Sequence, residues 1–257
     1  MKNKSLSLLP SLLFALPLSL APVLANAHYL WLEQHGAEPR LYFGEINEVR
    51  EKSPGRLDEI PAPKVWSGEG AARRDYSATR TATHFALAAA GAAAKGAAGA
   101  PLLASETSIG VKDWTKSGLG IVKPMFYARN AAWPAKAAVA PELALDIVPV
   151  AGRKNTFQVF FNGAPLPKAK VAIVAPNDWT RDEHTDAQGF VTLPTPWRGT
   201  YLLEVIHKEA KAGEYEGKPY ESLRHRMTLT FTQAGGISPQ GTGGGASLQS
   251  HAGMAAQ

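Results

Sequence analysis

The second half of the chain consists of short segments rich in β-branched and aromatic residues, separated by glycine and proline turns. Six such segments cover residues 143–148, 156–161, 170–174, 189–193, 200–206 and 224–232. Segments of this length and regular spacing are typical of an antiparallel β-sandwich. The turn sequences Asn162-Gly163 and Asp186-Ala187-Gln188-Gly189 contain residues that tolerate the positive φ of tight turns. We therefore predict a C-terminal β-sandwich domain over residues 141–233.

The first half also has β-prone runs, at residues 28–33 and 40–44, on either side of a turn at His35-Gly36. This pattern predicts a β-hairpin. Residues 130–141 are rich in alanine and proline and favour a domain boundary. We predict an N-terminal β domain over residues 28–140, and hence an all-β fold of two tandem antiparallel β-sandwich-like domains. Residues 234–257 lack core-forming side chains and are predicted to be a flexible tail.

The N-terminus has the three-part layout of a secretory signal peptide. Lys2 and Lys4 precede an apolar stretch, and the small-residue pattern Ala25-Asn26-Ala27 follows it. We predict that residues 1–27 are removed on export and that the mature protein is periplasmic. The absence of cysteine suits an exported protein that folds without disulfides. No second apolar run reaches the roughly 18 residues of a membrane span, so none is expected in the mature chain.

His28 follows this predicted cleavage site directly. Cleavage after Ala27 would place an α-amine and an imidazole on one residue, whereas cleavage after Ala25 would make His28 the third residue. Either end can chelate a divalent metal ion, and nitrogen-rich tetragonal donor sets favour Cu(II) or Ni(II). The alternative is that His28 lies near the cleavage site without binding metal.

His207 and His225 lie on the apolar sides of two successive predicted strands. If these strands pair as a hairpin, both histidines face the same way near its loop end. Two neutral imidazoles on adjacent strands form half of a metal site, which His28 could complete. The alternative is that each histidine is hydrogen-bonded to the backbone or to Tyr220.

Other functional classes lack support in the sequence. The net charge of +5 is spread out, without a cluster of Lys and Arg interleaved with aromatic residues, so no nucleic-acid partner is expected. The chain has no Gly-x-Ser-x-Gly elbow, no His-Glu-x-x-His motif and no phosphate-binding glycine loop. We therefore predict that the protein is not an enzyme.

Six segments, taken in order, resemble an exported and uncharacterised bacterial family, the domain of unknown function 4198. They cover residues 27–33, 41–45, 123–129, 160–166, 185–189 and 199–204. The family is related to periplasmic components of nickel and cobalt uptake systems. The resemblance implies a mostly β protein with a metal ligand at His28, and His207 and His225 as further donors. The second half also resembles the carboxypeptidase-regulatory or transthyretin-like sandwich, in which a Thr-Asp-x-x-Gly turn is frequent.

These observations predict a periplasmic binder of Ni(II), Co(II) or Cu(II) associated with metal uptake, with a separate membrane permease as its partner. One alternative is a non-catalytic structural or interaction module that presents its loops to a protein or glycan partner. Six tryptophans could serve there as platforms or anchors. A further alternative is an enzyme with a copper bound by the N-terminal histidine, which requires a second histidine at the same metal.

Overall fold

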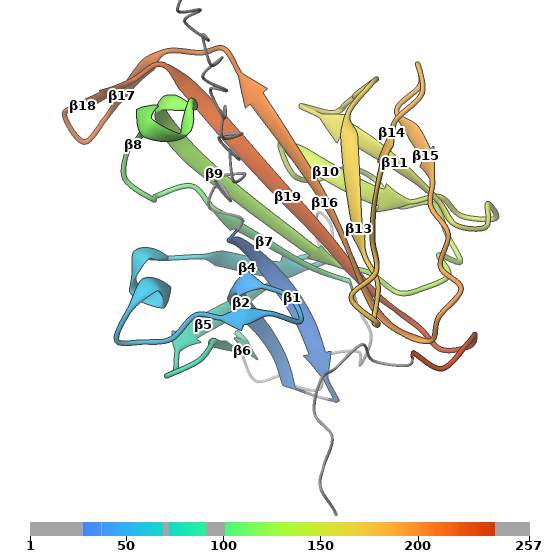
Figure 1. The fold of residues 1–257 in the computed structure, drawn as a ribbon. Coiled ribbons are helices and arrows are strands. Elements are labelled where there is room, and N and C mark those ends of the chain that lie inside the picture. Colours follow the sequence, from blue (N-terminus) through green and yellow to red (C-terminus); the bar gives the residue numbers. More distant parts are fainter. Residues whose placement is uncertain (1–27, 37, 69–71, 91–100, 240–257) are drawn as a thin grey trace, which may run out of the picture.

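The computed structural model describes residues 28–36, 38–68, 72–90 and 101–239. These residues form β-strands joined by turns and two short 3₁₀ segments, η1 (Arg56–Glu59) and η3 (Thr115–Ser117), without an α-helix (Figure 1). The predicted all-β fold class is thereby confirmed. No helix in this part of the chain could cross a membrane. The predicted signal peptide and residues 240–257 of the predicted tail lie outside the described residues.

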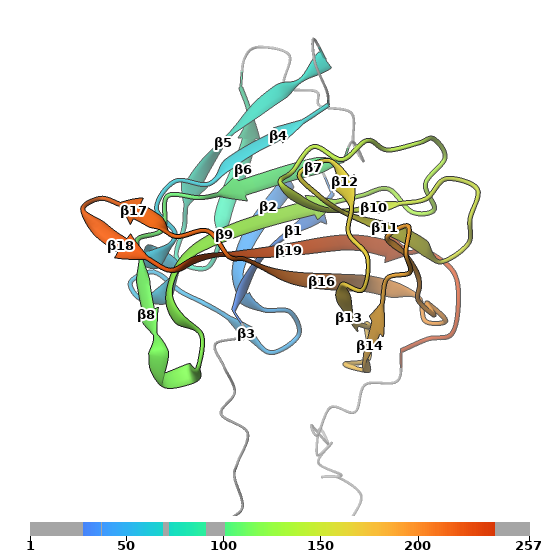
Figure 2. The same cartoon turned by 90° about the horizontal axis from the view of Figure 1, so that it is seen from above.

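Thirteen strands form one large, curled sheet (Figures 1 and 2). Its main order is β1 (Tyr29–His35), β2 (Glu38–Glu45), β6 (Phe85–Ala89), β5 (Arg74–Arg80), β4 (Lys64–Ser67), β7 (Leu102–Glu106), β9 (Gly120–Asn130), β19 (Ser222–Gln233), β16 (Gly199–Glu209), β13 (Lys170–Val174) and β14 (Thr180–His184). Two short strands lie off this main order: β3 (Val49–Arg50) pairs with β2, and β8 (Lys112–Trp114) pairs with β9. Neighbouring strands are antiparallel except β9 and β19, which are parallel.

A smaller sheet packs on the β16–β19 side of the large one and completes a sandwich. It contains β10 (Leu145–Pro149), β11 (Thr156–Phe161), β12 (Ala164–Pro165) and β15 (Phe190–Thr192). Fully buried side chains from both sheets, including Ile147, Phe157, Leu203 and Leu229, share one hydrophobic core. Each of the six segments predicted in this half contains a strand. β17 (Gly213–Tyr215) and β18 (Lys218–Tyr220) form a separate hairpin.

The large sheet continues across the predicted domain boundary after residue 140, because β9 precedes the boundary and its neighbour β19 follows it. The first seven strands of the order surround their own core, which includes Leu30, Leu41, Phe85 and Leu102. Two cores therefore share one sheet. The division into two domains stays a prediction. The start of the predicted tail is anchored, since Ile237 is hydrogen-bonded to Pro196 and Arg198.

The two faces of β19 have different partners, as expected where successive side chains alternate along a strand. Met227, Leu229 and Phe231 face the sandwich core. On the opposite face, Thr228 Oγ1 donates a hydrogen bond of 2.6 Å to the carbonyl oxygen of Leu30. Thr230 Oγ1 donates the corresponding hydrogen bond to the carbonyl oxygen of Leu32, also in β1. These bonds hold β1 across β19, directly after His28.

Candidate functional site

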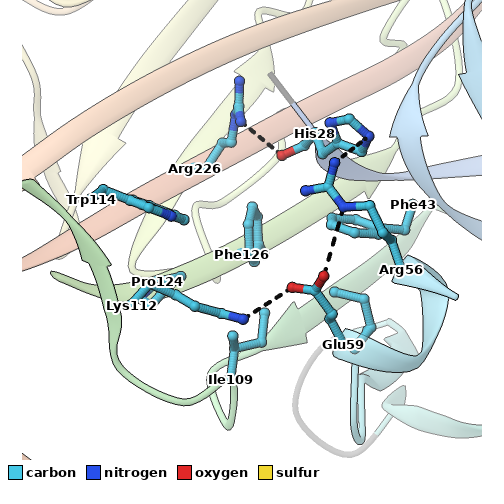
Figure 3. A pocket seen from close by; sticks show the side chains of 11 residues that line it. His28, Phe43, Arg56, Glu59, Ile109, Lys112, Trp114, Pro124, Phe126 and Arg226 are labelled. Carbon is cyan, nitrogen blue, oxygen red and sulfur yellow. Dashed lines mark hydrogen bonds and ion pairs between the residues drawn. The ribbon is translucent and has the colours of Figure 1, made fainter. Parts of the chain in front are cut away.

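His28 lies directly before β1, beside a pocket between η1, β8, β9 and β19 (Figure 3). Arg226 of β19 donates a 2.7 Å hydrogen bond from Nη1 to the backbone oxygen of His28. The side chain of His28 is only 14% exposed, and its ring contacts that of Phe43 with the centroids 5.6 Å apart. Both the backbone and the imidazole are therefore fixed in place.

The Nε2 atom of His28 is paired with Glu51, whose Oε1 it contacts closely. Nη1 of Arg56 lies 3.2 Å from the same nitrogen and 3.7 Å from Glu51 Oε1. A guanidinium can only donate hydrogen bonds, whereas a neutral imidazole nitrogen can either donate or accept. The close carboxylate favours a proton on Nε2 that is donated to Glu51, with Arg56 paired to the same carboxylate. This tautomer is assigned from the hydrogen-bond network, and it leaves the lone pair on Nδ1.

The Nδ1 atom of His28 is buried and has no hydrogen-bond partner. Glu45 Oε1, at the end of β2, lies 3.4 Å from it. Leaving a buried polar atom unsatisfied costs about 1–3 kcal/mol, so such an atom calls for an explanation. Two possible side-chain donors, Nδ1 and the Glu45 carboxylate, therefore lie next to each other. A metal held there would take its third donor from the α-amine of a chain that begins at His28.

Sequence reasoning did not identify Glu51 or Arg56 as partners of His28. Residues 45–64 are charged and interrupted by prolines, which is typical of a loop. Glu51 is 23 residues from His28 in the chain. Only the turn into β3, which pairs with β2, brings the two together. No local pattern could have indicated this contact.

His207 and His225 are directly opposite each other in the antiparallel pair of β16 and β19, as the predicted hairpin required. Their ring centroids are 6.4 Å apart. Phe161 of β11 packs against both, at centroid distances of 4.3 Å to His207 and 5.1 Å to His225. The structure therefore brings these two histidines together at one end of the sandwich.

Both ring nitrogens of His225 have hydrogen-bond partners. Nδ1 lies 3.2 Å from the Tyr127 hydroxyl, and Nε2 lies 2.9 Å from Glu209 Oε2. Desolvation by burial lowers the pKa of His225, which outweighs the opposite effect of Glu209. Burial also lowers the pKa of His207. Burial therefore disfavours the charged form of both imidazoles, and His225 is hydrogen-bonded to Tyr127 and Glu209 rather than to Tyr220.

The large sheet separates His28 from the other two histidines. Arg226, which binds the His28 carbonyl, and His225 are consecutive in β19, so their side chains lie on opposite faces. The expectation that His28 completes a site with His207 and His225 is therefore not met. Within the described ranges, no group of three or more His, Asp or Glu side chains is placed to hold a metal ion.

The six tryptophans, all within the described residues, have no fully exposed member. Trp31 and Trp66 are buried. Trp133, Trp179 and Trp197 are half-buried against the sandwich core, and Trp114 is half-buried at the pocket beside His28. These side chains contribute to packing more than they form an exposed aromatic surface.

The fold and this site together define an all-β, sandwich-containing protein with a histidine–carboxylate cluster at the start of its first strand. The chain belongs to the family described as Domain of unknown function (DUF4198), whose model matches residues 25–209. The predicted family membership is thereby confirmed. The matched range includes His28, Glu45, Glu51 and His207. No curated protein and no solved structure matches the chain.

Proposed function

We propose that this protein is a periplasmic transition-metal-binding protein that chelates Ni(II), Co(II) or Cu(II) through His28 at its mature N-terminus. The observation that carries the proposal is the buried Nδ1 of His28, which has no hydrogen-bond partner. The α-amine and Nδ1 of an N-terminal histidine can close a chelate ring around one metal ion. Glu45, at 3.4 Å from Nδ1, supplies a carboxylate for the same ion.

The contact between Nε2 and Glu51 supports the same reading. Histidines that bind metal usually donate their second ring N–H to a carboxylate, carbonyl or water, which fixes the tautomer and makes the ligating nitrogen more basic. Glu51 occupies that position, and Arg56 holds the carboxylate in turn. The ligands must be unprotonated, so the affinity falls as the pH is lowered.

Association with metal uptake, by delivery to a separate membrane permease, belongs to the same proposal and rests on the family resemblance. A glycan- or protein-binding module would be favoured by exposed aromatic side chains, and the burial of the tryptophans offers no such support. A copper enzyme would need a second histidine at the metal of His28. His207 and His225 lie on the other face of the sheet, so they do not supply it.

The test compares a chain that begins at His28 with one that carries a single additional alanine before it. Isothermal titration with Ni(II) and Cu(II) should show tight binding only for the first chain, with a loss of more than about a hundredfold for the second, because a ligand is removed and not merely an outer-shell partner. Replacement of the exposed His184 by alanine is the matched control and should leave the affinity unchanged. Equal affinity of the two chains would exclude the α-amine as a ligand and refute the proposal. Intact-mass measurement of the exported protein establishes which N-terminus the cell produces.

A further inference from the structure

Another pocket lies at the end of the sandwich where the chain turns from β10 into β11. Its walls come from this turn, from the chain that follows β9 and from the last residue of β19. The pocket is open to solvent and has a volume of about 410 Å³. This volume is within the roughly 300–1,000 Å³ typical of small-molecule sites.

One wall of this pocket is apolar and is held in place by the sandwich core. The half-buried ring of Trp133 stacks on Phe157, with the centroids 5.0 Å apart, and packs on Phe231 at 4.5 Å. Both phenylalanines are fully buried. Pro134 and Val150 extend the wall. A ligand can therefore pack an apolar body against this wall without rearranging the protein.

The pocket also carries positive charge that no carboxylate compensates. Arg153 and Lys154 both line it, whereas no Asp or Glu of the described residues does. Neither side chain forms an ion pair within the described part of the chain. The guanidinium of Arg153 lies 4.6 Å over the ring of Phe190, a contact that leaves its N–H donors available. Both side chains are exposed, so an anion can reach them.

The turn that carries the two cations is anchored to the neighbouring segments. The backbone N–H of Val150 donates to the carbonyl oxygen of Thr156, and that of Leu193 donates to the carbonyl oxygen of Asn155. Oδ1 of Asn155 accepts a 2.9 Å hydrogen bond from Thr195 Oγ1, so its amide N–H groups remain as donors at the pocket. Anchoring of this kind reduces the entropy lost when a ligand binds.

We propose that this pocket binds a small organic dicarboxylate with an apolar body. The two carboxylates pair with Arg153 and Lys154, and the body packs on Trp133. A bare inorganic anion would leave the apolar wall uncovered, and a monocarboxylate would compensate one cation of the two. An organic cation would be repelled. His28 does not line this pocket, so the site goes beyond the function proposed above and does not depend on it.

Isophthalate is the probe, because it carries two carboxylates on one ring, whereas benzoate carries one and isophthalamide is uncharged. Each is titrated, by ligand-detected NMR, into metal-free protein with an additional alanine before His28, so that no metal there can hold a carboxylate. Isophthalate should bind about threefold or more tighter than benzoate and about tenfold or more tighter than isophthalamide, because each analogue lacks charge-assisted contacts. Failure of metal binding at His28 would not change this result.

Two double variants with the same change in net charge complete the test. Arg153→Gln with Lys154→Gln should weaken isophthalate binding about tenfold or more. Lys168→Gln with Lys218→Gln removes two exposed cations outside the pocket and should leave binding unchanged. Equal unfolding midpoints would show that both variants fold. The proposal is overturned if isophthalate does not bind, if either analogue binds as tightly, if the first double variant binds like the unmodified chain, or if the second loses as much affinity as the first.

Discussion

Replacement of Glu51 by glutamine tests how His28 is prepared for metal binding. The substitution keeps the shape and one acceptor oxygen but removes the negative charge that faces Nε2 and Arg56. Second-shell changes of this kind typically lower metal affinity by about 10–100-fold, which corresponds to about 1.4–2.7 kcal/mol at 25 °C. We expect a loss in this range for Ni(II) and Cu(II), because the neutral amide makes Nδ1 less basic and fixes the tautomer less firmly.

The measurement is a competition titration against a chelator of known affinity, with chains that begin at His28. Glu48→Gln is the matched control, since Glu48 lies exposed in the turn between β2 and β3 and away from the imidazole contacts. It should bind metal like the unmodified chain. Unchanged affinity in a folded Glu51→Gln variant would refute the assignment of the proton to Nε2. A loss far beyond a hundredfold would also contradict it, because Glu51 would then be a ligand itself.

Three further predictions concern stability. Arg129→Met should lower the free energy of unfolding by about 3–5 kcal/mol, because it leaves the buried Asp146 carboxylate without its cationic partner; chemical denaturation measures it. The unfolding free energy should fall as the pH drops below about 6.5, because burial lowers the pKa of His225 and the unfolded chain then binds more protons than the folded one. His225→Gln should flatten this dependence between pH 7 and pH 5. Thr228→Val should cost about 1 kcal/mol, since the carbonyl oxygen of Leu30 loses a hydrogen bond.

The first two of these predictions have a control at the surface. Lys170→Met breaks an ion pair whose side chains are 60% and 52% exposed, so it should change stability by less than about 1 kcal/mol. A loss as large as that of Arg129→Met would contradict the role of burial. His184→Gln should leave the pH dependence as it is. An unchanged slope in His225→Gln would show that this imidazole does not govern it.

The strands and the placement of His207 opposite His225 could be predicted from the sequence, because both depend on local periodicity. In β19, alternation with a period of two places His225, Met227 and Phe231 on one face. The same rule, with a polar loop between the two strands, predicted that His207 and His225 meet. Local sequence also identified the start of β1, because β-prone residues follow His28 directly.

The pairing of β9 with β19, the crossing of β1 over β19 and the partners of His28 could not be predicted, because they depend on contacts between distant segments. The parallel pairing of β9 with β19 joins residues about a hundred positions apart, such as Met125 and His225. The crossing of β1 over β19 depends on threonine hydroxyls and Arg226, which the alternating pattern identifies only as a polar face. A polar face usually meets solvent, and here it binds the carbonyl oxygens of another strand. Without that crossing, the partners of His28 could not be deduced.

The alternation along β19 also determines how the two histidine clusters relate to each other. His225 and Arg226 are neighbours in sequence, yet one anchors Glu209 at the sandwich end and the other holds the backbone of His28. A strand sends consecutive side chains to opposite faces, so no side-chain ligand can be shared between the two clusters. Protonation of the His207–His225 pair should therefore affect the stability of the sandwich and leave the donors at His28 in place. The pH dependence of metal affinity then reports on the ligands at His28 alone.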